Sequence, residues 1–294
     1  MDKPLELGST QAVGAVKRVL REGGYGKVKI GHGGTLDPLA TGVLPIALGE
    51  ATKLAGRMLD ASKMYDFTIR FGEQTDTLDA EGKVIATSPH RPSLADVEAV
   101  LGRFTGPIEQ VPPAYSALKV DGQRAYDLAR AGQDVAMKMR AVVIHDLHIR
   151  HPGEGNDDDG LGEITLTAHV SKGTYVRSLA RDIARALGTV GHVTMLRRVK
   201  AGPFTLEPAI SLDKLQECGK GRTLEDIILP LEAGLDDIPA LCLTPGQARL
   251  IRQGQVLDGI SADDGLHCAW ADDVPVALVE VSDGNVRVVR GFNL

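Results

Sequence analysis

Residues 64–72 read MYDFTIRFG, and this stretch decides the fold class of the larger part of the chain. Its side chains alternate between apolar and polar with the period of two that a β-strand imposes. The apolar side holds Tyr65, Phe67, Ile69 and Phe71, and the polar side holds Asp66, Thr68 and Arg70. The stretch therefore predicts a half-buried strand on which Tyr65 faces the interior.

Other strands and helices are predicted on both sides of this strand. The predicted strands are residues 28–30, 141–150, 163–171 and the stretch VTMLRRVKAGPF (193–204), with the polar run PGEGNDDDG (152–160) as a solvated loop. The predicted helices are a first one capped by Ser9 or Thr10 and ended by Gly23-Gly24, one capped by Ser93, one after Arg124, and one over 175–187 capped by Thr174. Such irregular alternation indicates an α+β fold, with a mixed, mainly antiparallel sheet and flanking helices and loops.

The distribution of charge and composition divides the chain into two predicted domains. The net charge of −6 is unusual for a protein that binds nucleic acid. From Asp236 onward there are nine acidic and four basic residues, which leaves 30 acids and 29 bases before that point. We therefore expect a larger domain over 1–235, able to gather positive charge on one face, and a small β-rich domain over 236–294.

Composition also argues against several classes of protein. The chain has no apolar run of membrane-spanning length and no secretory signal, so a cytoplasmic protein is expected. The three cysteines lie far apart and form no C-x-x-C pair, which disfavours a zinc knuckle. In a strand, the spacing of His145, His148 and His151 would send His148 to the opposite face, so no metal site is predicted there.

The stretch GHGGTLDPLATG (31–42) is predicted to be a shaped loop because it combines closely spaced glycines with a proline. Pro38 disfavours the helical conformation for Asp37, and the glycines allow another backbone to approach closely. The loop thus presents the Asp37 carboxylate at a crowded place. For a lone Asp-Pro in a glycine-rich loop, a simple Asx turn is the more common explanation. A nucleotide-binding loop is disfavoured because the glycine spacing fits neither common phosphate-binding pattern.

Arg177 is predicted to lie in the first turn of its helix, where the helix dipole disfavours a cation. An anionic partner is therefore expected. Arg181 and Arg185 continue a stripe at helical spacing that a solvated surface would also explain.

Five motifs in order resemble the bacterial tRNA pseudouridine-55 synthase family, TruB, over nearly the whole chain. The motifs are GHGGTLDPLATGVLP, KMYDFTIRFGEQTDTLDAEG, VPPAYSALKVDGQRAY, KGTYVRSLARDI and MLRR. The resemblance implies a cofactor-free isomerase that converts a T-loop uridine of tRNA to pseudouridine, together with a small PUA-like C-terminal RNA-binding domain. It makes Asp37 the attacking carboxylate, with the sugar C1′ and the uracil ring as alternative points of attack.

The same resemblance implies roles for further residues. Arg177 would pair with Asp37 and offset the cost of burying its charge in a dry pocket. Tyr65 would stack on the target base and help remove its C5 proton, Leu196 would form an apolar wall, and His32 would fill the space left by the flipped base. Phosphate contacts are expected from Lys17, Arg18, Lys172, Arg197 and Arg198, and also from Arg21, Lys27, Lys29 and Lys200.

The expected partner is the T-arm of tRNA, bound by a monomer without an obligatory protein partner. Two alternatives share these motifs. One is a guide-RNA-dependent pseudouridine synthase, and the other is an RNA-folding module in which catalysis is secondary. The segment VPPAYSALKVDGQRAY and the acidic C-terminal part favour the stand-alone enzyme.

Overall fold

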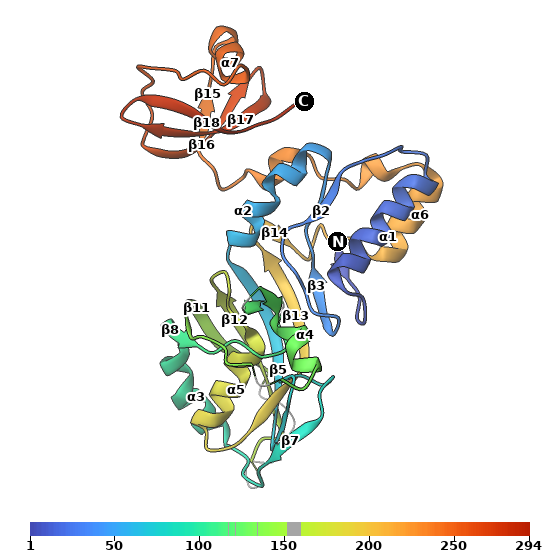
Figure 1. Ribbon diagram of the computed structural model, residues 1–294, viewed down its shortest axis with the longest axis vertical. Coiled ribbons are helices and arrows are strands. Elements are labelled where there is room, and N and C mark those ends of the chain that lie inside the picture. The colour runs from blue at the N-terminus through green and yellow to red at the C-terminus, as the bar shows by residue number, and fades with distance from the viewer. Residues whose placement is uncertain (117, 121, 134, 152–159) are drawn as a thin grey trace. The chain divides into compact units, whose positions relative to one another are not determined.

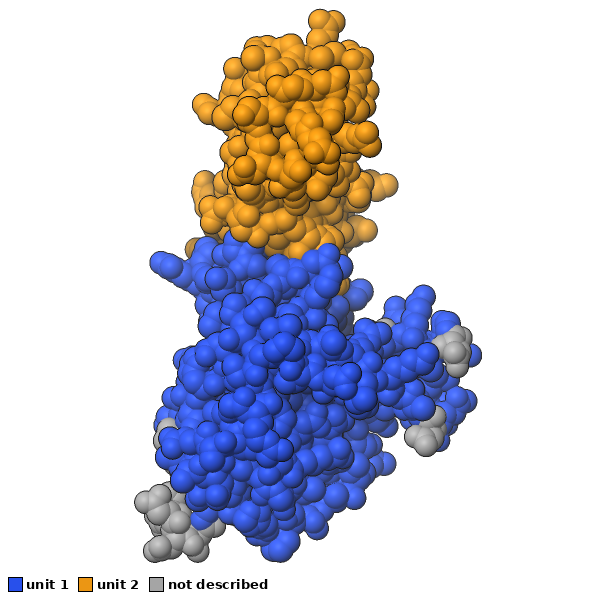
Figure 2. Space-filling model, turned by 90° about the vertical axis from the view of Figure 1, so that its left-hand side faces the viewer, with its two compact units in different colours: residues 1–12, 35–44, 59–212 blue, residues 13–34, 45–58, 213–294 orange. Residues whose placement is uncertain are grey.

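The computed structural model describes residues 1–116, 118–120, 122–133, 135–151 and 160–294. The predicted polar loop at 152–160 lies, except for Gly160, outside the described residues. The chain forms two compact units, each built from several segments (Figure 2). Unit 1 contains residues 1–12, 35–44 and 59–212, and unit 2 contains residues 13–34, 45–58 and 213–294. The predicted domain boundary at 235/236 stays a prediction.

Unit 1 is built around one eight-stranded sheet (Figure 1). Its strands, in spatial order, are β1 (Asp2–Lys3), β3 (Ala40–Val43), β13 (Gly191–Ala201), β5 (Lys63–Phe71), β12 (Glu163–Val170), β11 (Arg140–His151) and β8 (Gly106–Gln110), with β14 (Phe204–Thr205) paired to β13. All neighbours are antiparallel except β3 and β13, which run parallel. The predicted mixed, mainly antiparallel sheet is confirmed.

Strand β5 confirms the strand predicted at 64–72, and it lies in the middle of this sheet, between β13 and β12. Phe67, Ile69 and Phe71 are buried in the main core, and Tyr65 packs against its edge. Helices α3 (Leu94–Leu101) and α5 (Val176–Ala186) contribute the other side of that core. On the polar side Arg70 is exposed, but Asp66 and Thr68 are buried, which differs from the half-buried strand expected. Asp66 is buried because Thr167 donates a hydrogen bond to it at 2.7 Å and Arg150 forms an ion pair with it at 2.5 Å.

The predicted helix caps are confirmed at one site and wrong at two. Ser93 caps α3 in a reciprocal box with Asp96. The residue preceding α5 is Tyr175, without a side-chain cap, so the predicted Thr174 cap is wrong. Helix α1 (Ser9–Glu22) occupies the predicted range, but the Ser9 hydroxyl bonds to Leu36. Gln11 instead accepts a hydrogen bond from the backbone N–H of Gly8 at 2.8 Å.

Short elements connect the strands of unit 1. They are the hairpin β6 (Glu73–Thr75) and β7 (Val84–Thr87), the pair β9 (Lys119–Val120) and β10 (Gln123–Arg124), helix α4 (Ala125–Arg130) and the 3-10 turn η2 (Gly102–Phe104). Helix α4 confirms the helix predicted after Arg124. Helix α2 (Ala55–Asp60) has residues in both units.

Unit 2 contains a four-stranded sheet, which confirms the predicted β-rich character of the C-terminal segment. Its order is β15 (Ala240–Cys242), β16 (Gly265–Ala271), β17 (Val274–Ser282) and β18 (Asn285–Gly291), and helix α7 (Pro245–Arg252) packs against it. The unit also contains β2 (Ile30–His32) paired with β4 (Ile46–Leu48), helix α6 (Leu212–Gly221) apart from its first residue, and the 3-10 turns η1 (Gly49–Leu54), η3 (Leu224–Asp226) and η4 (Leu231–Gly234). Strand β2 begins two residues later than the predicted start at residue 28.

Gly42 permits the parallel pairing of β3 with β13. Its φ of +100° lies in the left-handed region, and a Cβ atom there would overlap the carbonyl of Arg198, its partner in the register. Gly42→Ala should therefore destabilise the protein by at least about 1–3 kcal/mol. Gly14→Ala, in an open helical position of α1, should instead stabilise it by about 0.5–1 kcal/mol. Urea unfolding measures both; equal midpoints for Gly42→Ala and wild type would contradict this account.

Candidate active site

Asp37 lies in the loop between β2 and β3 and reaches a pocket of unit 1. The loop turns at this point because the N–H of Ala40 donates to the carbonyl of Asp37 at 3.0 Å. The Asp37 side chain remains 44% exposed. The other residues that line the pocket are Leu39, Ala40, Asp79, Arg177, Val193, Thr194 and Leu196. A charged carboxylate is thus presented beside apolar side chains.

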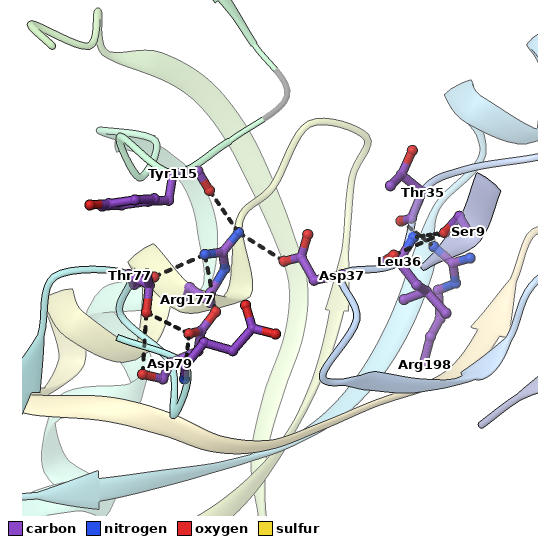
Figure 3. Close-up of polar contacts among 10 residues, drawn as sticks. Ser9, Thr35, Leu36, Asp37, Thr77, Asp79, Tyr115, Arg177 and Arg198 are labelled. Atoms are coloured by element: carbon purple, nitrogen blue, oxygen red, sulfur yellow. Dashed lines mark hydrogen bonds and ion pairs between the residues drawn. The ribbon is translucent and has the colours of Figure 1, made fainter. Parts of the chain in front are cut away.

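Arg177 connects Asp37 to the interior of unit 1 (Figure 3). Its Nη2 lies 2.8 Å from Oδ2 of Asp37, and its Nη1 lies 3.1 Å from Oδ2 of Asp79. The Arg177 side chain is only 8% exposed. The ion pair with Asp37 that the family resemblance implies is therefore present, and it also supplies the anion expected near the start of α5.

Two backbone carbonyls complete the surroundings of the guanidinium. Nη1 donates to the carbonyl of Thr77 at 2.9 Å, and Nη2 donates to the carbonyl of Tyr115 at 3.1 Å. A buried arginine requires such partners because each unsatisfied N–H would keep its full desolvation cost. Four acceptors from three chain segments therefore fix the plane of the guanidinium.

Asp79 is a site residue that sequence reasoning missed. The hydroxyl of Thr77 donates to its Oδ1 at 2.5 Å, and the N–H of Glu81 donates to the same oxygen at 3.1 Å. The opposite oxygen then faces Arg177. The run EQTDTLDAEG is typical of a polar turn, so composition alone hides this carboxylate. A buried arginine needs more than one hydrogen-bond acceptor, and this need could have indicated a second carboxylate near Arg177.

The carboxylates outnumber the cation at this site. Burial raises the pKa of Glu81, and the negative charges of Asp79 and then Asp37 raise it further. Arg177 lowers it by a smaller amount. Arg177 therefore stands between acidic groups that would repel one another without it.

Leu196 and Tyr65 occupy different positions relative to the pocket. Leu196 lines the pocket from β13, as the resemblance implies. Tyr65 is half-buried on β5, opposite Arg198 in the register with β13, and it is not one of the lining residues. The structure therefore brings Asp37, Arg177 and Leu196 together around the pocket.

The predicted phosphate-binding residues of unit 1 are in three different environments. Lys172 is exposed and pairs with Asp60 at 2.9 Å. Arg197 is half-buried and pairs with Asp2 at 2.7 Å. Arg198 is only 1% exposed, and it donates to the carbonyls of Val43 at 2.7 Å and Thr35 at 3.3 Å. Its burial differs from the surface contact expected, because its guanidinium supports the Asp37 loop from within.

Lys200 is an exposed residue of unit 1, and the remaining predicted residues, which include Arg21, Lys27 and Lys29, belong to unit 2. Lys17 and Arg18 are exposed on α1, and His32 is half-buried at the end of β2, opposite Ile46 of β4. Over the described ranges, no three His, Cys, Asp or Glu side chains are grouped as a metal site would require. No helix among the described residues is long and apolar enough to cross a membrane.

Removing the guanidinium should lower the stability of the protein. Arg177→Met leaves the buried Asp79 without its cation, so the free energy of unfolding should fall by about 3–5 kcal/mol. Arg185→Met alters an exposed arginine two turns later on α5 and should change stability by less than about 0.5 kcal/mol. Urea unfolding compares the variants. A loss for Arg177→Met no larger than for Arg185→Met would show that the buried network contributes nothing.

Comparison with known proteins identifies the family. Residues 18–176 match the TruB family pseudouridylate synthase N-terminal domain, and residues 177–236 match the tRNA pseudouridylate synthase B C-terminal domain. The chain is 67% identical to tRNA pseudouridine synthase B of Novosphingobium aromaticivorans, over 100% of this chain and 96% of that protein. It is 56% identical to the protein of the same name from Zymomonas mobilis, over 100% of this chain and 94% of that protein.

Solved structures show the same fold at lower sequence identity. A structure of an H/ACA RNP bound to a substrate RNA containing 2′-deoxyuridine includes a chain with a TM-score of 0.74 and 23% identity, covering 100% of this chain and 84% of that one. A chain of the archaeal box H/ACA sRNP Nop10-Cbf5 complex gives a TM-score of 0.71, also at 23% identity, covering 99% of this chain and 84% of that one. By the family match and the full-length relatives, this chain belongs to the TruB family of pseudouridylate synthases.

Proposed function

We propose that Asp37 is the attacking carboxylate with which this chain converts uridine 55 in the T-loop of tRNA to pseudouridine. As a TruB family member the chain is a tRNA pseudouridine synthase, an isomerase. One observation carries the proposal for Asp37: its carboxylate is partly exposed at the pocket, while the arginine that holds it is buried. This combination suits a group that must be charged and also reach a substrate.

The reaction is an isomerisation, so its atoms balance without an oxidant or a donor group. The bond from C1′ to N1 breaks, the uracil turns, and a bond from C1′ to C5 forms. The proton on C5 is lost and N1 gains one. A carboxylate can serve as a covalent nucleophile at C1′ or at the ring, or it can stabilise positive charge that develops at C1′. All three possibilities require Asp37 to be ionised.

Arg177 suits the task of keeping Asp37 ionised once a base excludes water from the pocket. Burial penalises a carboxylate, and a cation in contact offsets that penalty. Arg177 contacts Oδ2 of Asp37. Within the part of the chain that the structure describes, no hydrogen bond reaches Oδ1 of Asp37, so we assign the attack to this oxygen.

The target base must leave the folded T-loop before Asp37 can reach it, and extrusion costs a few kcal/mol. We assign the wall of the base pocket to Leu196 because it lines the pocket. We assign stacking and removal of the C5 proton to Tyr65, and we assign the filling of the vacated space to His32. The assignments for Tyr65 and His32 rest on the family motifs.

Binding of the tRNA T-arm would use phosphate contacts outside the pocket. Lys17, Arg18 and Lys172 are exposed, and Arg197 is partly exposed, so we keep these four as contacts. We assign a PUA-like RNA-binding role to the predicted domain at 236–294. We expect a monomer that needs no protein partner and works in the cytoplasm, where tRNA is modified.

The guide-RNA-dependent alternative has less support than the stand-alone enzyme. Full-length relatives named tRNA pseudouridine synthase B reach 67% identity, whereas the chains from H/ACA complexes reach 23%. An RNA-folding role can accompany catalysis because both need the same grip on the T-arm. The two enzyme hypotheses differ in one requirement, which is whether a guide RNA must be added.

Asp37→Asn tests the assignment of the carboxylate. The substitution removes the charge but nearly preserves the shape, so single-turnover conversion should fall by a factor on the order of a thousand or more. The dissociation constant for tRNA should stay within about threefold, which is under 1 kcal/mol. Asp146→Asn, an exposed position on β11, makes the same chemical change and should leave the rate unaltered. Conversion by Asp37→Asn near the wild-type rate would exclude Asp37 as the nucleophile.

A further inference from the structure

The backbone that carries Asp37 is held from behind by buried polar side chains. Among the described residues, Arg177 is the one ionic or hydrogen-bonding partner of the Asp37 side chain. Residues 33–39 belong to no helix or strand, so no regular backbone pattern fixes this loop. The position of the carboxylate therefore depends on contacts made by the residues on either side of it.

Ser9 makes the most direct of these contacts (Figure 3). Its hydroxyl accepts a hydrogen bond from the N–H of Leu36 at 2.8 Å and donates one to the carbonyl of Leu36 at 2.9 Å. The carbonyl of Leu36 belongs to the peptide bond that also contains the nitrogen of Asp37. One hydroxyl thus holds both peptide groups next to Leu36, and the second of them leads directly into Asp37.

Two other side chains hold the peptides on either side of this contact. Arg198 donates to the carbonyl of Thr35, and the ammonium of Lys3 donates to the carbonyl of Pro38 at 3.2 Å. Ser9 bonds to the peptide group that contains the nitrogen of Asp37, whereas these contacts of Arg198 and Lys3 fall one peptide group further from Asp37 on either side. It is 4% exposed, so water cannot readily replace its hydrogen bonds.

The start of α1 leaves the Ser9 hydroxyl available for this contact. Ser9 is the first residue of α1, and Gly8 before it occupies the cap position, because the Gly8 carbonyl accepts a hydrogen bond from the N–H of Ala12 at 2.9 Å. The Gln11 side chain accepts the hydrogen bond of the Gly8 N–H. The Ser9 hydroxyl instead bonds to Leu36, 27 residues away in the sequence and next to the proposed nucleophile.

We propose that Ser9 is a positioning residue for Asp37, fixing the Leu36–Asp37 peptide so that the carboxylate meets the reacting uridine in productive geometry. The inference rests on the proposed function of Asp37. It implies a loss in the chemical step without a loss in tRNA binding, because Ser9 is buried and is not one of the residues that line the pocket. A displacement of about 1 Å at a reacting group can lower a rate by roughly a hundredfold.

The test is a graded series at position 9. Ser9→Ala removes the hydroxyl, and Ser9→Cys keeps a side chain of similar size with a weaker donor and acceptor. Single-turnover pseudouridine formation should fall roughly 10- to 100-fold in Ser9→Ala and by less in Ser9→Cys. The dissociation constant for tRNA should stay within about twofold for both variants.

A matched control separates positioning from general stability. Thr189 is similarly buried, and its hydroxyl donates to the carbonyl of His90 at 2.9 Å, outside the pocket. Thr189→Val should lower the unfolding temperature to a comparable degree and leave the single-turnover rate unchanged. A rate loss equal in Thr189→Val and Ser9→Ala, or rates in both Ser9 variants within twofold of wild type, would overturn the proposal.

The failure of this inference can be distinguished from the failure of the proposed function. If Asp37→Asn is inactive while the Ser9 variants are as active as wild type, Asp37 remains the nucleophile and only the positioning role is lost. If Asp37→Asn is active, the proposed function fails whatever the Ser9 variants do. A change confined to tRNA affinity in Ser9→Ala would also contradict positioning, because the chemical step would then be intact.

Discussion

The site depends on a single buried cation shared by two carboxylates. Arg177 reaches Asp37 with one nitrogen and Asp79 with the other, and the carbonyls of Thr77 and Tyr115 accept its remaining contacts. A buried guanidinium is stable only when nearly all its donors are satisfied. The loop around Asp37, the turn at 77–81, the extended segment at 115 and helix α5 must therefore all be in place before the site exists.

This arrangement gives the two carboxylates different surroundings. Asp79 is fixed by Thr77 and by the N–H of Glu81, so it anchors the arginine. Asp37 retains an exposed oxygen at the pocket, which a nucleophile requires. Its own flexibility is limited from the opposite side, where Ser9 holds the neighbouring peptide. The carboxylate of the proposed catalytic group is thus held by Arg177, and the backbone that carries it is held by Ser9, so the group is preorganised.

Features that neighbouring residues determine could be predicted from the sequence, whereas features that depend on residues far apart in the chain could not. The alternation of residues 64–72 is local, so it correctly predicted the strand β5, but it did not predict the central position of that strand in the sheet. The helix-dipole argument correctly demanded an anion beside Arg177. Asp79, Ser9 and Arg198 could not be assigned in this way, because their partners lie far away in the sequence and no periodicity marks such contacts. From the sequence, Arg198 was expected to be a surface charge. In the structure it is buried and donates to the carbonyls of Val43 and Thr35.

The central claim is that this chain alone, through a carboxylate held by Arg177, isomerises one uridine of the T-loop. Site-resolved mapping of pseudouridine tests it most directly, on an unmodified full-length tRNA transcript incubated with the purified protein and no guide RNA. The account predicts pseudouridine at position 55 and at no other uridine, and none at all in a transcript with cytidine at that position. Pseudouridine at a different position, or none without an added guide RNA, would contradict the account.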